Sequence, residues 1–456
     1  MRRSRIRRTL LRLAITVVVL ALVVGGAVAA TLGYGVYRDR QAVADTVPQR
    51  PVEQPYRPAI AQVASTVAPS AAGVTTQIEA ALRNPDLGDF TGVIADAGTG
   101  QVLWQRDATR PRTPASTTKV LTAAAALLTL PADKRITTTV VGGTVPGEAV
   151  LVGAGDPTLR AGGQSLFTDA PKIADLAAQL RRAGTPITKI VVDTSLFTGT
   201  DFARGWERAD IAGGDITPLQ SLIADSGRIR PAEDYSPRVT DPALTAGRAL
   251  ATALGLPPTA VVEGTAPQGA TQLAAVRSAP LSTRLHDALV HSDNVLAEAI
   301  GREVAIATNQ PASFDGAARA VVAALRNAGF DLTGVELSDT SGLSNANRIP
   351  ATVLDGIVTA AAGNGKPQLR PLLDLLPVAA ATGTLADRYT TVNRPGAGYV
   401  RAKTGSLSGV STLAGYVPGR DGAVLTFTLM SSGTPVDVAR PAMDAVTAAL
   451  RGCGCR

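Results

Sequence analysis

Residues 114–130 read Pro-Ala-Ser-Thr-Thr-Lys-Val-Leu-Thr-Ala-Ala-Ala-Ala-Leu-Leu-Thr-Leu. This pattern predicts a long, buried helix that begins near Ser116. Residues three apart lie on one helix face, so the Ser116 hydroxyl and the Lys119 amine point the same way. A serine becomes a nucleophile when a neighbouring base takes its proton, and lysine can be that base if burial lowers its pKa. The same four-residue sequence would also be compatible with a purely structural arrangement, in which the Ser caps the helix and the Lys is exposed.

Two further motifs follow. Ser292-Asp293-Asn294 stands between apolar segments, where a second hydroxyl could relay a proton and the Asn294 amide could hold a peptide carbonyl. Lys403-Thr404-Gly405-Ser406 lies on a strand-like run and offers a cation and a hydroxyl to a substrate carboxylate, while its glycine lets another backbone approach. Taken alone, Ser292-Asp293-Asn294 is also compatible with a helix-capping turn. Taken alone, the K-T-G motif is also compatible with a solvated lysine on an edge strand. All three in this order arise by chance on the order of once in several hundred such chains.

Composition argues against several other chemistries. His286 and His291 are the only histidines and lie five residues apart, which argues against a multi-histidine zinc site and against a Ser-His-Asp triad. The formal net charge is +7, but six of these charges come from N-terminal arginines: Arg2, Arg3, Arg5, Arg7, Arg8 and Arg12. The rest of the chain therefore lacks the charge balance of a nucleic-acid-binding protein. We expect no metal, no cofactor and no nucleic acid partner.

The N-terminal segment predicts an export or membrane element over residues 1–40. Residues 13–37 carry no charge, and as a helix they would extend roughly 37 Å, enough for a hydrocarbon core of about 30 Å. The preceding arginines favour a single-pass signal anchor, with the body of the protein on the extracytoplasmic side of the membrane. A signal peptide cleaved near Ala27-Val28-Ala29, which would release the protein from the membrane, is the alternative. Residues 41–75, rich in Pro, predict a linker.

The remaining sequence predicts an α/β fold whose main sheet is completed from both ends of the chain. Phe90–Arg106 has a hairpin pattern, and three strand-like runs followed by a helix close the chain: Tyr399–Lys403, Ser411–Val417, Ala423–Met430 and Val436–Leu450. We therefore assign residues 76–145 and 280–456 to one domain and 146–279 to an inserted domain. Cys453 and Cys455, the only cysteines, predict a frayed tail or a local disulfide.

The motifs S-x-x-K, S-x-N and K-T-G occur together in β-lactamases and penicillin-binding proteins. Over about residues 76–450 the chain most closely resembles the D-Ala-D-Ala carboxypeptidase/endopeptidase family, the class C low-molecular-mass penicillin-binding proteins. The segment between Ser116 and Ser292 is shorter than usual for this family, so we expect one inserted domain instead of two. Other stretches that carry the resemblance are Gly153–Leu159, Val191–Phe197, Asp339–Ser344, Ala381–Leu385, Arg388 and Arg401–Leu407.

This resemblance implies a transpeptidase-like domain and a serine-type carboxypeptidase, endopeptidase or both. The substrates would be peptidoglycan peptides ending in D-Ala-D-Ala or cross-linked through D-Ala, with β-lactams as inhibitors. The implied catalytic residues are Ser116, the acylated nucleophile, Lys119, its proton acceptor, and Ser292. The implied substrate-binding residues are Asn294, Lys403, Thr404, Gly405 and Ser406, with the N–H groups of Ser116 and Ser406 in the oxyanion-hole positions.

The environments of the two lysines should separate their roles. We expect Lys119 to be buried and to act as the base, whereas Lys403 stays charged at the cleft edge and Ser292 bridges the two. A serine β-lactamase is one alternative function, although the glutamates after the second motif, Glu298, Glu303 and Glu336, lack the Asn four residues on that a class A enzyme would carry. A non-catalytic cell-wall scaffold on the same fold is the other.

Overall fold

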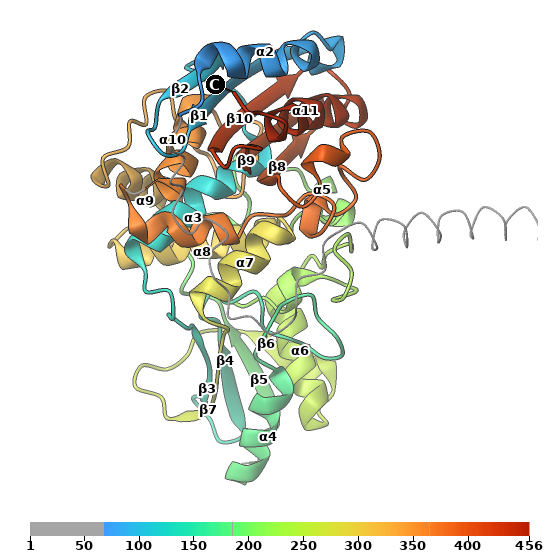
Figure 1. Ribbon diagram of the computed structural model, residues 1–456. Helices are drawn as coiled ribbons and strands as arrows, with labels where there is room; N and C mark the ends of the chain where they lie inside the picture. The colour runs from blue at the N-terminus through green and yellow to red at the C-terminus, as the bar shows by residue number, and fades with distance from the viewer. Residues whose placement is uncertain (1–67, 185, 364, 456) are drawn as a thin grey trace, which may run out of the picture. The chain divides into compact units, whose positions relative to one another are not determined.

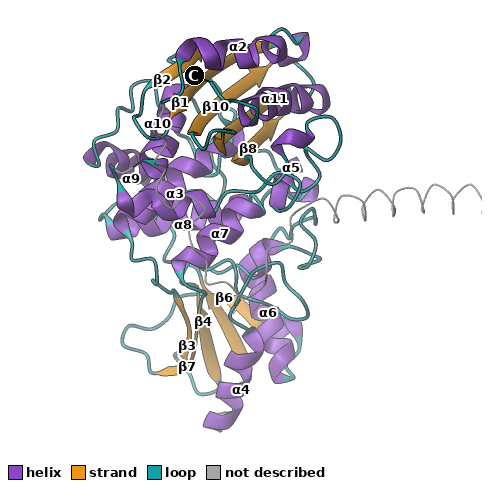
Figure 2. Ribbon diagram, in the orientation of Figure 1, coloured by secondary structure: helices purple, strands orange, loops and turns teal. Residues whose placement is uncertain are grey.

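The computed structural model describes residues 68–184, 186–363 and 365–455. They form two five-stranded sheets with helices packed on them, the mixed α/β class that the sequence predicts (Figure 2). The predicted anchor and most of the predicted linker, residues 41–67, lie outside the described residues. No helix in the described ranges combines the length and the apolar character needed to cross a membrane.

The first sheet joins the N-terminal hairpin to the C-terminal strands. Its antiparallel order is β2 (Val102–Arg106), β1 (Asp89–Asp96), β10 (Val424–Ser432), β9 (Val410–Pro418) and β8 (Arg401–Leu407). Strands β1 and β10 pair from Asp89 opposite Ser432 to Asp96 opposite Leu425. Strand β8, which carries the K-T-G motif, is left at the sheet edge.

Helices cover both faces of this sheet because its central strands alternate apolar side chains between two cores. Leu425, Phe427 and Leu429 of β10 point into a core shared with α2 (Ala71–Leu82) and α11 (Val436–Arg451). Val424 and Met430 belong to a second core. That core also holds helices that lie together in Figure 1: α3 (Thr118–Thr129), α7 (Leu281–Val290), α8 (Asn294–Ala307), α9 (Phe314–Asn327) and α10 (Ala351–Ala362).

The second sheet has the order β6 (Val261–Glu263), β5 (Lys189–Asp193), β4 (Glu148–Val152), β3 (Thr137–Gly142) and β7 (Gln272–Arg277). Strands β4, β5 and β6 are parallel, and α4 (Ile173–Ala183) and α6 (Pro242–Leu254) share their apolar core. Strand β3 pairs with β4 and β7 in this sheet, although the predicted boundary after residue 145 placed it in the first domain. The sequence pattern of Thr137–Val141 is compatible with a strand in either sheet. Its pairing with β4 and β7 places it in the second sheet.

Part of the predicted insertion does not belong to the second sheet. Trp206, Ile211 and Leu219, around α5 (Ala209–Gly213), form an apolar cluster with Val295 and Phe314 of α8 and α9. This packing brings the loops around residues 203–240 to the start of α8, where the S-x-N motif lies. Short 3-10 helices complete the description: Pro85–Leu87, Ala115–Thr117, Asp225–Gly227, Pro258–Ala260, Pro367–Asp374, Gly383–Leu385 and Arg394–Gly396.

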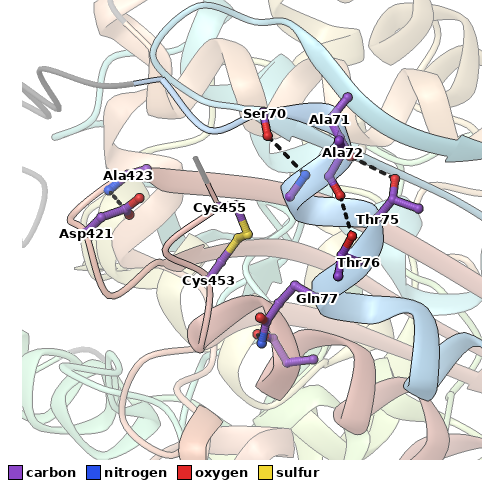
Figure 3. The surroundings of a disulfide bond; sticks show 12 residues. Ser70, Ala71, Ala72, Thr75, Thr76, Gln77, Asp421, Ala423, Cys453 and Cys455 are labelled. Atoms are coloured by element: carbon purple, nitrogen blue, oxygen red, sulfur yellow. Dashed lines mark hydrogen bonds between the residues drawn. A yellow bond between two sulfur atoms is a disulfide. The ribbon is translucent and has the colours of Figure 1, made fainter.

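Helix α2 corrects the predicted linker, since residues 71–75 are helical. Ser70 caps the helix by accepting the Gly73 N–H at 3.0 Å, and its own N–H donates to the Cys455 carbonyl at 2.7 Å. Cys453 and Cys455 form a disulfide, and both are buried against α2 (Figure 3). Of the two predicted states of the tail, the local disulfide is the one found. The tail packs because the disulfide and neighbouring apolar side chains form part of one core.

Candidate active site

Ser116 and Lys119 lie at the start of α3. Ser116 belongs to the 3-10 helix Ala115–Thr117 that leads into α3, and its side chain is half-buried at the edge of a cavity. Ala115 has a φ of 47°, a left-handed conformation that non-glycine residues adopt mainly where surrounding structure holds them. The Nζ atom of Lys119 lies 3.0 Å from the Oγ atom of Ser116. The shared helix face therefore places the amine within reach of the hydroxyl proton.

Lys119 is fully buried and held by two further oxygens. Its Nζ atom donates to Asn294 Oδ1 at 2.6 Å and to the Ser341 carbonyl at 2.8 Å. Burial lowers the pKa of Lys119 to about 8, against the opposing effect of Asp339 and other nearby carboxylates. Near neutral pH a fraction of the amine is therefore uncharged and able to accept a proton. Asn294, predicted as a substrate-binding residue, also donates from Nδ2 to the Asp215 carbonyl at 3.2 Å.

Ser292 lies in the break between two helices. Helix α7 ends at Val290 and α8 begins at Asn294, and Ser292 between them has a φ of 54°. The Ser292 hydroxyl accepts a hydrogen bond from Lys403 Nζ at 2.9 Å. No hydrogen bond joins Ser292 to Lys119 in the described ranges, so Ser292 does not bridge the two lysines as expected.

Two buried arginines fix the residue that follows Ser292. Asp293 Oδ2 lies 2.8 Å from Arg228 and 3.4 Å from Arg238, while Asp293 Oδ1 caps α8 by accepting the Leu296 N–H at 2.7 Å. Burial by itself would raise the pKa of Asp293, but the two guanidinium charges and the Leu296 N–H outweigh it and hold the pKa well below its usual range. Arg228 and Arg238 come from the predicted insertion, so that segment helps to build the site.

Strand β8 lies directly beside the turn that carries Ser116. A Cβ atom on Gly405 would stand 2.9 Å from the Ser116 backbone nitrogen and 2.8 Å from the Pro114 carbonyl oxygen. Glycine is therefore needed for this close approach, as the K-T-G motif predicts. Thr404 donates from Oγ1 to Thr384 Oγ1 at 2.7 Å, so both hydroxyls are held at the same edge of the sheet.

Lys403 does not lie exposed at the cleft edge, and that part of the expectation is wrong. It is fully buried, and Nζ donates to Ser292 Oγ and to the Thr404 carbonyl, each at 2.9 Å. Burial, and then the charge of Lys119, lower the pKa of Lys403 well below its ordinary value. Both lysines of the motifs are therefore buried, because Lys403 points from β8 to the corner between α7 and α8.

A cavity of about 480 Å³ brings the predicted residues to one place. It is lined by Ser116, Ser292, Asn294, Thr404 and Ser406. Lys119 contacts Ser116, and Lys403 contacts Ser292. In the part of the chain that the structure describes, no group of three or more His, Cys, Asp or Glu side chains is arranged to hold a metal ion.

Glu298 was not predicted as part of the site. Its buried carboxylate accepts the N–H groups of Thr340 and Ser341 at 2.9 and 2.7 Å, and the Ser341 carbonyl in turn accepts from Lys119. Burial raises the pKa of Glu298 to about 7. The signal in the sequence is an acid one helical turn after Asn294 in an otherwise apolar stretch, but its partner segment lies about forty residues away in sequence.

The fold and the three motifs gathered at one cavity define the class of serine hydrolases that contains β-lactamases and penicillin-binding proteins. Within this class, the chain belongs to the D-Ala-D-Ala carboxypeptidase 3 (S13) family, whose model matches residues 74–234 and 232–452. The family assignment confirms the predicted serine-type D-Ala-D-Ala carboxypeptidase, a hydrolase.

Individual relatives agree with this assignment. The chain is 48% identical over 463 residues to Carboxypeptidase DacB of Mycolicibacterium smegmatis, covering 100% of both chains. It is 51% identical over 404 residues to Carboxypeptidase Rv3627c of Mycobacterium tuberculosis, covering 87% of each. The crystal structure of penicillin binding protein 4 from Haemophilus influenzae superposes with a TM-score of 0.68 at 22% identity, covering 82% of this chain and 97% of that one. This last similarity shows the fold.

Proposed function

We propose that this protein hydrolyses peptidoglycan stem peptides ending in D-Ala-D-Ala through an acyl-enzyme on Ser116. The observation that carries the proposal is the 3.0 Å separation of Lys119 Nζ and Ser116 Oγ, at a cavity also lined by Ser292 and the β8 edge. A hydroxyl with an adjacent base is the arrangement that nucleophilic catalysis requires. β-Lactams, which present a reactive amide to the same hydroxyl, are the expected inhibitors.

The chemistry follows from the positions of the two buried lysines. The Ser116 oxygen attacks the carbonyl carbon of the penultimate D-Ala, and its proton passes to the neutral Lys119 amine. The backbone N–H groups of Ser116 and Ser406 stabilise the negative charge on the carbonyl oxygen. The C–N bond then breaks: the departing D-Ala amine takes a proton from Ser292 Oγ, and Ser292 takes one from Lys403 Nζ, which lies 2.9 Å away. Water then attacks the ester carbonyl and its proton returns to Lys403 through Ser292, while the Ser116 oxygen leaves and recovers its proton from Lys119.

Substrate binding is assigned to the walls of the same cavity. Strand β8 ends the sheet order, so an extended peptide can lie along its Lys403–Ser406 edge. Thr404 and Ser406 present hydroxyls there, and Gly405 permits the approach. Asn294 accepts a hydrogen bond from Lys119 through its amide oxygen and also lines the cavity.

Mass spectrometry of muropeptides tests the proposal. Purified protein incubated with pentapeptide and cross-linked muropeptides should remove the terminal D-Ala, and cleavage of the cross-link would add endopeptidase activity at the same serine. The Ser116→Ala variant should leave both substrates intact. Unchanged substrates with the wild-type protein, together with no labelling by a fluorescent penicillin, would instead support the cell-wall scaffold. Rapid release of hydrolysed penicillin would support a β-lactamase.

We also infer an extracytoplasmic location with the anchor at residues 13–37. The charge pattern of the N-terminal residues supports this, as does the buried Cys453–Cys455 disulfide, since disulfides persist in oxidising compartments. Fractionation of intact cells tests it. The anchor predicts full-length protein in the membrane fraction, whereas a shortened protein in the medium or cell wall would show that the signal is cleaved.

A further inference from the structure

Four arginines line the cavity, and three of them form ion pairs with carboxylates of the protein. Arg228 and Arg238 pair with Asp293, and Arg388 pairs with Asp444. Each of these three guanidinium groups is therefore held in place by an ion pair within the protein. The motif lysines are held in place as well, because they are buried and donate to protein oxygens.

Arg440 is the exception among the arginines of the cavity. It lies in the first half of α11, its side chain is exposed, and its guanidinium donates to Ser406 Oγ at 2.9 Å. No ion pair involves Arg440 in the described ranges. Its charge and its remaining N–H groups are therefore available to an anion that enters the cavity.

The partner of Arg440 places this charge beside the nucleophile. Ser406 follows Gly405, whose Cα lies so close to the Ser116 backbone nitrogen that a Cβ there would stand 2.9 Å away. Ser406, Ser116 and Arg440 all line the same cavity. An anion held between Arg440 and the Ser406 hydroxyl would thus sit next to the turn that carries Ser116.

We propose that Arg440, together with the Ser406 hydroxyl, binds the terminal carboxylate of the peptide substrate, an inference that rests on the function proposed above. A planar guanidinium presents paired N–H groups that match the two oxygens of a carboxylate. The cleaved bond lies one residue from that carboxylate, so a site for it must be close to Ser116. The hydroxyls of Thr404 and Ser406 lie along the same edge of β8 and complete a polar site.

This assignment gives Lys403 and Arg440 different roles, which the sequence alone does not distinguish. Lys403 Nζ donates to Ser292 Oγ and to the Thr404 carbonyl and is fully buried. Lys403 therefore serves the proton path through Ser292, and Arg440 supplies the exposed charge that selects carboxylate-bearing substrates. Loss of Lys403 should slow every substrate, whereas loss of Arg440 should affect only those with the carboxylate.

A pair of synthetic thioesters isolates this contact. In one, an acyl-D-Ala group is joined to thioglycolate, which carries a free carboxylate; in the other, to methyl thioglycolate, which does not. Both leave the same acyl group on Ser116. In Arg440→Gln, kcat/KM for the carboxylate thioester should fall by about 10- to 100-fold, the worth of a charge-assisted hydrogen-bonded pair. The value for the methyl ester and the deacylation rate should be unchanged.

Two further variants make the result specific. Arg440→Lys should restore part of the lost selectivity, because the charge returns without the planar fork. Arg182→Gln, which removes an exposed arginine of α4 outside the site, should leave both thioesters unaffected. Equal losses for the two thioesters in Arg440→Gln, or no loss for either, would overturn the assignment to the terminal carboxylate.

The experiment also separates failure of this assignment from failure of the proposed function. If wild-type protein forms no acyl-enzyme with either thioester, the proposed function fails and the carboxylate site fails with it. If wild-type protein reacts with both and Arg440→Gln loses activity only on stem peptides with additional side-chain carboxylates, the acylation mechanism stands. Arg440 would then bind another part of the substrate, and the assignment to the terminal carboxylate is wrong.

Discussion

The Nζ atom of Lys119 lies 3.0 Å from the Oγ atom of Ser116, with the lysine fully buried and the serine at the edge of the cavity. Burial lowers the pKa of Lys119 to about 8. A base works only in its unprotonated form, so the acylation rate should rise with pH through about 8 and then level off. Stopped-flow measurement of acylation by a thioester between pH 6 and about 10 checks this. A profile that is flat over this range would exclude Lys119 as the base.

Replacement of Ser116 should remove the nucleophile without disturbing the fold. Ser116→Ala should give no covalent labelling by fluorescent penicillin, while its circular dichroism and melting temperature stay close to wild type, since the lost hydroxyl is only half-buried. Ser282→Ala, an exposed serine of α7, is the matched control and should label normally. Labelling that persists in Ser116→Ala would move the acylated residue elsewhere.

The Arg228–Asp293 ion pair should be costly to break from one side. Both side chains are almost fully buried, so Arg228→Met leaves a carboxylate only partly compensated, and we expect a loss of about 3 kcal/mol in the free energy of unfolding. The acylation rate should also fall, because Asp293 fixes the turn that carries Ser292. Urea unfolding followed by fluorescence measures the first effect, and thioester kinetics the second.

Arg230 supplies the control on the same loop. It pairs with Glu233 at the surface, with about half of each side chain exposed, so Arg230→Met should cost no more than about 1 kcal/mol and leave acylation unchanged. Similar losses in Arg228→Met and Arg230→Met would contradict the special role given to the buried pair.

Asp355 should make the protein less stable as the pH rises. It is buried in α10, and burial raises its pKa to about 7 although Thr359 donates a hydrogen bond to Oδ2 at 3.3 Å. The folded state therefore keeps the Asp355 proton at pH values where the unfolded chain has lost it. Its contribution is complete below about pH 4 and is lost as the pH rises towards 7 and above, at about 1.4 kcal/mol per unit of pKa difference. Urea unfolding at several pH values should show a smaller decline in Asp355→Asn than in wild type.

Two glycines in helices should respond in opposite directions to the same substitution. In an exposed helix interior, Gly→Ala stabilises by up to about 1 kcal/mol. Gly356 of α10 has open space where a Cβ would lie, so Gly356→Ala should raise the melting temperature. In α2, a Cβ on Gly73 would stand 2.9 Å from the Cys455 backbone, so Gly73→Ala should lower it. An increase for both would show that the Cys453–Cys455 tail does not pack on α2.

Features that depend on residues close together in the chain could be predicted from the sequence alone. The S-x-x-K spacing predicted that Ser116 and Lys119 share one helix face. The glycine at position 405 predicted the close approach of another backbone segment, which is the turn at Ser116. Alternating apolar residues identified the strands that became β1, β9 and β10. These features follow from helix and strand periodicity, which acts over a few residues.

Other features depend on contacts between segments that are far apart in the chain. The segment that forms β3 is compatible with either sheet by its sequence, and its pairing with β4 and β7 assigns it to the second sheet. The sequence likewise did not show that Lys403 is buried beside Ser292 or that Arg440 is exposed at Ser406. Lys403 hydrogen-bonds Ser292, which is 111 residues away in the sequence, and Arg440 hydrogen-bonds Ser406, which is 34 residues away. The environment that sets the state of each cation therefore exists only once the chain has folded.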